Sequence, residues 1–177
     1  MSSHEDASGL IVETHIELEG TSDLPLERLL AAAQVAAREA GFVGPAGLTL
    51  VFVNDAHIQA LNRDYRGVDA PTDVLAFGEK SEDERPPAAP FIAPQGMDEE
   101  DIPYLGDVIV SLPQATRQAG ERGHPVESEL CLLVVHGVLH LLGHDHAADD
   151  ERRAMWEIQR RALRRLGCEA AAPAETV

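Results

Sequence analysis

The sequence predicts an α+β fold in which a mixed sheet of about four strands is packed with helices. Runs rich in β-branched residues are interspersed with segments whose apolar residues recur at helical spacing. These strands and helices do not follow a strict β-α-β order, which argues against a purely parallel sheet. The length of 177 residues suits a single domain with a sizeable core.

The N-terminal part is expected to form a strand followed by a helix. Residues 10–18 alternate partly between apolar and polar, which predicts a strand. Residues 21–23 then offer capping side chains, and Pro25 suits a first helical turn. Apolar residues recur at helical spacing from there to Ala37, so a helix is predicted that ends before Gly41.

Two further strands frame a short helix in the middle of the chain. Residues 48–53 are rich in β-forming residues and give the strongest strand prediction. Asn54 or Asp55 can cap a short helix that carries Ile58 on its apolar side. After a loop, residues 73–77 read as the third strand.

The C-terminal part is expected to contain the fourth strand and three helices. Residues 105–112 form the strand, and residues 113–122 form a helix that ends at Gly123. Residues 126–142 form a central helix that is apolar nearly all round from Leu130, which predicts that it lies inside the domain. Asp149 or Asp150 can cap a last helix, with an apolar face opposite an arginine-rich one.

The predicted organisation is a single metal-dependent hydrolase domain over residues 9–167. Residues 1–8 are expected to be a disordered leader, and residues 168–177 a tail. Residues 78–103 are rich in acidic residues and proline, which predicts an insertion loop within the domain.

Charge and cysteine content limit the compartment and the partners. The net charge of −17 repels nucleic acid at long range, so any nucleic-acid activity needs a local basic patch, a metal or a docked partner. Two cysteines without a pairing pattern indicate a reducing compartment. The polar, acidic N-terminus lacks the pattern of a signal peptide, and no apolar run is long enough for a membrane span. The chain is therefore predicted to be cytoplasmic.

The strongest functional signal lies in residues 136–146, which contain four of the eight histidines. His136 and His140 are one helical turn apart and share a face, so both can bind one ion. Gly143 can reverse the chain and return His146 to them. Three imidazoles leave a fourth position open, as in catalytic zinc sites, so one Zn²⁺ per chain is predicted. Imidazole ligands also suit other metals, such as nickel.

Two alternatives to this centre remain open. His144 is four residues after His140 and can compete as a ligand, although it follows the glycine and can point away. A zinc metallopeptidase has the same histidine spacing but carries a glutamate as general base where this chain has Gly137. That difference argues against a peptidase.

Three blocks of this sequence together resemble the YbeY family of bacterial endoribonucleases that mature ribosomal RNA. They are residues 61–77, residues 105–111 and residues 136–146. Ala76 and Gly78 depart from the family pattern, which often has serine and proline there. Neither departure touches a proposed metal ligand.

The resemblance implies one zinc ion on His136, His140 and His146, with Arg66 and His136 as catalytic residues. It also implies cleavage of single-stranded RNA in 3′-end maturation of small-subunit (16S) rRNA and in ribosome quality control. The implied partners are rRNA and the ribosome or its small subunit, with no DNA. A non-catalytic ribosome-assembly factor whose metal is structural is the other alternative.

Several roles stay open on the residues alone. Arg66 can clamp a phosphate or form a surface salt bridge with Asp64, Asp69 or Asp73. Asp145 can orient a ligand, act as a base or cap the turn after Gly143. Asp73 and Asp107, at the ends of predicted strands, are candidates to hold a ligand imidazole. The attacking nucleophile can be water or the 2′-hydroxyl of the RNA.

Overall fold

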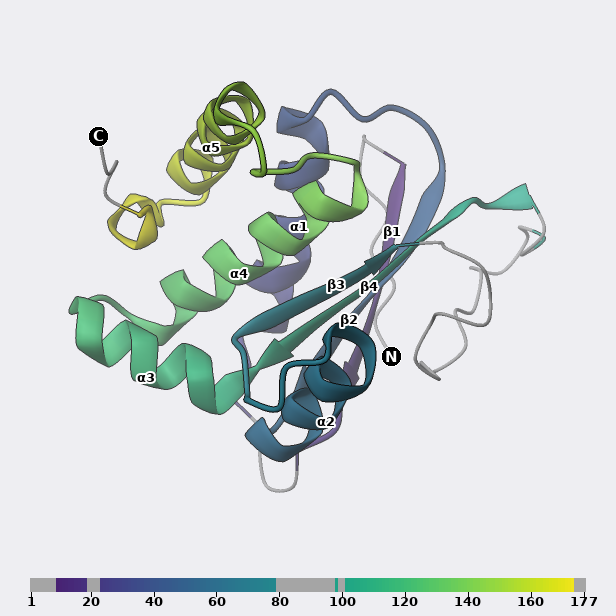
Figure 1. The fold of residues 1–177 in the computed structure, drawn as a ribbon. Coiled ribbons are helices and arrows are strands. Elements are labelled where there is room, and N and C mark those ends of the chain that lie inside the picture. The colour runs from purple at the N-terminus through teal and green to yellow at the C-terminus, as the bar shows by residue number, and fades with distance from the viewer. Residues whose placement is uncertain (1–8, 19–22, 79–97, 99–100, 174–177) are drawn as a thin grey trace.

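The structure, a computed structural model, describes residues 9–18, 23–78, 98 and 101–173. Its elements, in chain order, are β1 (Leu10–Ile16), α1 (Leu26–Glu39), β2 (Ala46–Val53), α2 (Asp55–Arg66), β3 (Val74–Gly78), β4 (Tyr104–Ser111), α3 (Leu112–Arg122), α4 (Val126–Leu141), α5 (Asp149–Arg165) and the short 3₁₀ helix η3 (Glu169–Ala171). Their arrangement is shown in Figure 1.

Within the described residues, the four strands form one mixed sheet in the order β1-β2-β4-β3. Strands β1, β2 and β4 are parallel, whereas β3 runs antiparallel to β4 and forms one edge of the sheet. This confirms the predicted α+β class with a four-stranded mixed sheet. The antiparallel edge strand also explains why the order of elements does not follow a repeated β-α-β pattern.

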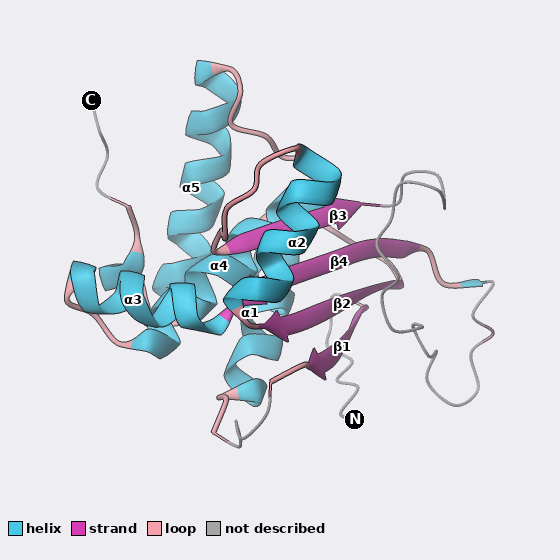
Figure 2. Ribbon diagram, turned by 60° about the horizontal axis from the view of Figure 1, so that its bottom comes forward, coloured by secondary structure: helices cyan, strands magenta, loops and turns pink. Residues whose placement is uncertain are grey.

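Apolar side chains alternate between the two faces of the sheet and build two separate cores. On one face, residues such as Leu50, Phe52 and Val108 belong to the larger cluster, to which α1, α4 and α5 also contribute side chains. On the other, Val53 and Ile109 pack against Ile58 of α2 in a smaller cluster. Figure 2 shows α2 lying over this second face. Helix α4 contacts β3 and β4 and lies between α1, α3 and α5, so the predicted central helix is in the interior.

The predicted caps are right for one helix and wrong for two. Asn54 caps α2, and its side chain accepts a hydrogen bond from the N–H of His57 at 2.9 Å. Helix α1 instead begins after Pro25 with no side-chain cap. Helix α5 begins after Ala148, not after an aspartate, and the N–H of Ala148 donates to Glu151 at 3.4 Å. Asp149 is already inside the first turn, where it pairs with Arg152.

Parts of the predicted organisation lie outside the described residues. They include the leader at residues 1–8, most of the acidic insertion and the last four residues. Residues 168–173, assigned to the tail, include η3, and both Cys168 and Ala171 are buried against the main core. Among the described helices, none has the length and apolar character needed to cross a membrane.

Candidate metal centre

Helix α4 holds two histidines in a fixed relation at the edge of the sheet. Eleven of its 16 residues are buried, so the helix cannot rotate without exposing its apolar sides. His136 and His140 are half-buried on the side that faces a cleft, and their Nε2 atoms lie 3.1 Å apart. The predicted sharing of one helix face is confirmed.

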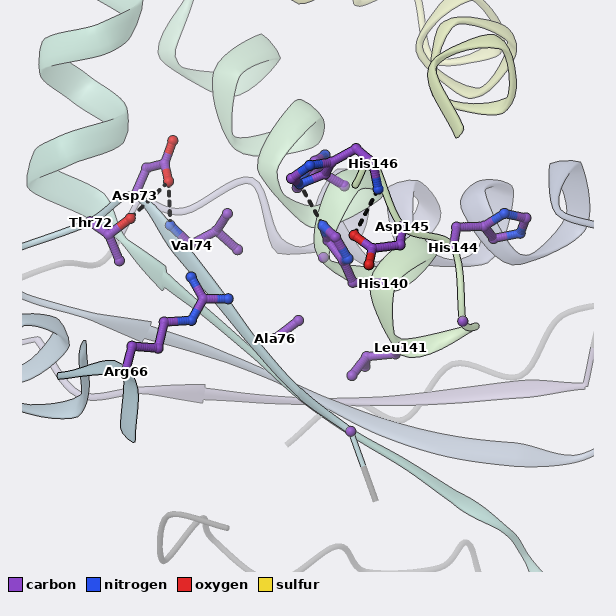
Figure 3. A pocket seen from close by; sticks show the side chains of 14 residues that line it. Arg66, Thr72, Asp73, Val74, Ala76, His140, Leu141, His144, Asp145 and His146 are labelled. Atoms are coloured by element: carbon purple, nitrogen blue, oxygen red, sulfur yellow. Dashed lines mark hydrogen bonds between the residues drawn. The ribbon is translucent and has the colours of Figure 1, made fainter. Parts of the chain in front are cut away.

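A chain reversal at Gly143 supplies the third histidine. Gly143 has a φ of +90°, in the left-handed region that favours glycine. Its N–H donates to the carbonyl of His140, and the N–H of His144 donates to that of Leu139, both at 3.0 Å. These two bonds form a Schellman motif, which satisfies the last carbonyls of the helix. The following residues return toward the helix, and the ring of His146 lies beside that of His140 (Figure 3). The centroid of the His146 ring is 5.6 Å from that of His136.

The three rings together form a group that can hold a metal ion. One nitrogen from each ring lies within 4.8 Å of the other two. The 3.1 Å between the Nε2 atoms of His136 and His140 is close to the about 3.3 Å that tetrahedral coordination at about 2.0–2.1 Å would require. His146 is exposed on a loop and can adjust by a small rotation. The donor set therefore fits a first-row transition ion such as Zn²⁺.

The surroundings keep the two helical imidazoles neutral. Burial lowers the pKa of His136 from its ordinary value, and its hydrogen bond to Gln159 offsets only part of this effect. Burial, together with the neighbouring histidines, lowers the pKa of His140 to about 4. Neutral rings are the form that binds metal. The C-terminal end of α4 also carries partial negative charge, which favours a cation there.

Gln159 of α5 orients His136 from behind and was not predicted from the sequence. Its Oε1 accepts a hydrogen bond from Nδ1 of His136 at 3.0 Å, and its side chain is only 3% exposed. This bond places the proton on Nδ1 and leaves the Nε2 lone pair directed at the cluster. A sequence signal existed, because Gln159 is a polar residue on the inward face of α5, four residues after the buried Met155.

Replacing Gln159 with leucine is expected to weaken metal binding about ten- to a hundredfold. Leucine has a similar volume but no acceptor, so the ring of His136 would lose both its orientation and its tautomer. Titration with zinc in a chelator buffer measures the affinity. The matched control is Gln159→Glu, which keeps an acceptor and should bind nearly as the wild type does. Equal affinity of the leucine variant and the wild type would contradict the role.

Arg66 is located across the cleft from the histidines, and the salt bridges that the sequence left open do not form. Asp64 pairs with Arg63, and Asp69 accepts from Gln59. Among the described residues, none forms a hydrogen bond or ion pair with Arg66. Its guanidinium points into a cleft of about 600 Å³ that the three histidines also line (Figure 3). Its charge is one of the causes that lower the pKa of His140.

The other candidate residues are distributed around the cleft. Asp145 accepts from the N–H of His146 at 2.7 Å, which is the turn-capping arrangement. His144 lines the cleft, but its ring points away from the other three histidines (Figure 3). Asp73 also lines the cleft, but its carboxylate accepts from the N–H of Val74 and from Gln118 and not from an imidazole.

Asp107 is on the wrong face of the sheet to support a metal ligand. Side chains alternate along a strand, so Asp107 shares the face of Ile109, toward α2, whereas Val108 faces α4. Asp107 is buried and accepts from the hydroxyl of Tyr104 at 2.5 Å. The idea that it holds an imidazole is therefore wrong.

Gly137 cannot be replaced by the glutamate of a metallopeptidase without a shift of the Val108 side chain or of α4. A Cβ at this position would lie 2.5 Å from Cγ1 of Val108 on β4. The close packing of α4 on β4 at this position favours glycine, which cannot act as a general base. The same histidine spacing here supports a different chemistry from that of the zinc peptidases.

The sequence is similar to proteins of a known family. The family described as Endoribonuclease YbeY matches residues 17–167. Proteins named Endoribonuclease YbeY from Pelotomaculum thermopropionicum and Alkalilimnicola ehrlichii are 49% and 42% identical to this chain. The first match covers 78% of this chain and 84% of the relative, and the second covers 92% and 90%.

A solved structure from Thermotoga maritima has a similar fold. It superposes with a TM-score of 0.52 at 21% identity, over 93% of this chain and 97% of that one. At this level of identity the likeness concerns the fold alone.

Proposed function

The chain belongs to the YbeY endoribonuclease family, and from this premise we propose that it cleaves single-stranded RNA at a zinc centre formed by His136, His140 and His146. The observation that carries the proposal is the meeting of this three-imidazole group in one cleft with Arg66, which has no partner among the described residues. We further propose that the substrate is the 3′ end of small-subunit rRNA, that the enzyme works on ribosomal particles, and that it does so in the cytoplasm.

The residues of the cleft have different roles in the proposed phosphodiester cleavage. When bound, a divalent ion there supplies Lewis-acid polarisation of the phosphoryl group. Arg66 presents a planar guanidinium that can bind two phosphoryl oxygens and stabilise the charge that develops on them. Gln159 holds the ring of His136, and Asp145 holds the backbone of His146. These contacts fix the geometry of the centre before substrate arrives.

The high negative charge of the chain makes this local arrangement important. With a net charge of −17, the protein as a whole repels a polyanion. A bound cation and the guanidinium of Arg66, which is unpaired within the described part of the chain, create a positive site against that background. Binding is therefore expected to concentrate at the cleft and to weaken as salt increases.

Removing the metal with a chelator is expected to abolish cleavage of a single-stranded rRNA fragment, and adding zinc is expected to restore it. The assay compares this RNA with a peptide library under the same conditions. His136→Ala purified in parallel controls for contaminating nucleases. Cleavage that survives chelation would contradict the proposal, and metal-dependent cleavage of peptides alone would favour the metallopeptidase.

A further inference from the structure

One wall of the cleft is formed by β3, which is an edge strand of the sheet among the described residues. Strand β3 is last in the sheet order and pairs only with β4 among the described strands. Its alternate residues Val74, Ala76 and Gly78 line the same cleft as Arg66 and the histidines. An unpaired strand edge presents a row of backbone donors and acceptors that another chain can use.

The ladder between β3 and β4 determines which backbone groups of β3 bond to β4 and which point off the edge of the sheet. The N–H of Ser111 donates to the carbonyl of Asp73 at 2.8 Å, so these opposite residues form a hydrogen-bonded pair. Such pairs alternate along an antiparallel ladder. Ala76, opposite Val108, therefore belongs to a pair without mutual hydrogen bonds. Its N–H and C=O point away from β4, and the same holds for Val74 and Gly78.

The outward N–H of Val74 has a hydrogen-bond partner, whereas the N–H and C=O of Ala76 have none among the described residues. The N–H of Val74 donates to Oδ1 of Asp73 at 2.7 Å. Within the described part of the chain, no hydrogen bond engages the N–H or C=O of Ala76. Ala76 is half-buried, lines the cleft and carries a small side chain that leaves room beside its backbone.

We propose that the edge of β3 at Ala76 binds an unpaired base of the substrate RNA through its backbone N–H and C=O. An adjacent donor and acceptor match the Watson–Crick edge of a nucleobase, which is free only in a single strand. Arg66 lies in the same cleft and provides the contact to the backbone phosphate. The inference rests on the proposed function and adds a reason for a single-strand requirement. The competing occupant of a strand edge is an extended peptide, and the positive charge of Arg66 in the cleft favours a phosphate-bearing strand over it.

Ala76→Pro tests the inference, because proline removes the outward N–H and breaks no bond to β4. The KM for a single-stranded rRNA fragment is expected to rise about tenfold, with kcat, metal content and Tm near those of the wild type. Val74→Pro is the matched control, since its N–H is held by Asp73 and is not offered to RNA. An unchanged KM in Ala76→Pro, or an equal rise in both variants, would overturn the inference.

Amide hydrogen exchange in the wild-type holoprotein gives a second measurement that does not depend on how the variants fold. A single-stranded 2′-O-methyl oligoribonucleotide is expected to slow exchange at Ala76, and the same sequence in a duplex is not. An unchanged rate at Ala76, protection by the duplex as well, or protection only by an extended peptide would overturn the inference. Failure of the wild type to cleave any RNA would instead refute the proposed function, so the two failures are distinguishable.

Discussion

His136→Ala is expected to give a folded protein that holds no metal at this centre and cleaves RNA at least about a thousandfold more slowly. A divalent ion held by the three histidines would contribute several kcal/mol of transition-state stabilisation, and a two-histidine site would bind it far more weakly. The fold should survive because α4 is anchored by buried residues on its other sides, among them Leu130, Val134 and Val138. Circular dichroism, metal analysis and a cleavage assay on the same preparation measure the three quantities.

His144→Ala is the matched control for this variant. It removes a histidine from the same turn, but one whose ring points away from the cluster (Figure 3). Metal content and cleavage should stay near those of the wild type. If instead His136→Ala unfolds, the metal is structural and the protein is better described as an assembly factor. If it still cleaves at the wild-type rate, the three histidines are not the catalytic centre.

Arg66→Ala is expected to keep the metal and the stability of the wild type while losing about a hundred- to a thousandfold in cleavage rate. Removing one preorganised donor to the developing charge typically has an effect of this size. Stability should not change, because Arg66 is exposed and has no hydrogen-bond or ion-pair partner among the described residues. Single-turnover cleavage, metal content and Tm are measured on one preparation.

Arg63→Ala controls for the loss of a positive charge from the same helix. Arg63 is also exposed on α2, one turn before Arg66, but it is paired with Asp64 at 2.9 Å. It should cleave nearly as the wild type does, because exposed pairs of this kind contribute little. Arg66→Lys should be intermediate, since lysine keeps the charge but not the planar fork. Undiminished cleavage by Arg66→Ala would remove this residue from the mechanism.

Much of the fold followed from local pattern because hydrophobic periodicity is a local property. The four strands and the central helix were found from residue spacing and lie within a few residues of their predicted ends. The N-caps of α1 and α5 were harder to predict, because several polar residues near the start of each helix could act as caps. Their spacing alone does not show where the first turn begins. Asn54 was the easier case, because it directly follows a strongly predicted strand.

The metal centre was predictable in part because its elements are close in sequence. His136, His140, Gly143 and His146 lie within 11 residues, so helix geometry and one turn determine their arrangement. Gln159 is 23 residues from His136 on another helix, and no local rule brings the two together. The prediction that Asp107 holds an imidazole was wrong for a different reason. The strand was located correctly, but the face to which Asp107 points depends on the register of β4 with the adjacent strands.

The sequence could not decide between a salt bridge and a phosphate contact for Arg66, because this depends on what the nearby aspartates bind. From the sequence alone, a phosphate clamp and a surface salt bridge with Asp64, Asp69 or Asp73 were equally good interpretations of Arg66. In the structure, Asp64 forms an ion pair with Arg63, and Asp69 accepts a hydrogen bond from Gln59. Asp73 accepts hydrogen bonds from Val74 and Gln118. Competition of this kind is decided by three-dimensional contacts, which spacing along the chain does not encode.

X-ray absorption spectroscopy of the protein, purified without a histidine tag, tests the metal centre most directly. The predicted result is one zinc ion per chain with three imidazole nitrogens at about 2.0–2.1 Å and one exchangeable light-atom ligand. The signal should disappear in His136→Ala and persist in His144→Ala. A substoichiometric ion, or a coordination shell with fewer than three imidazoles, would contradict the account.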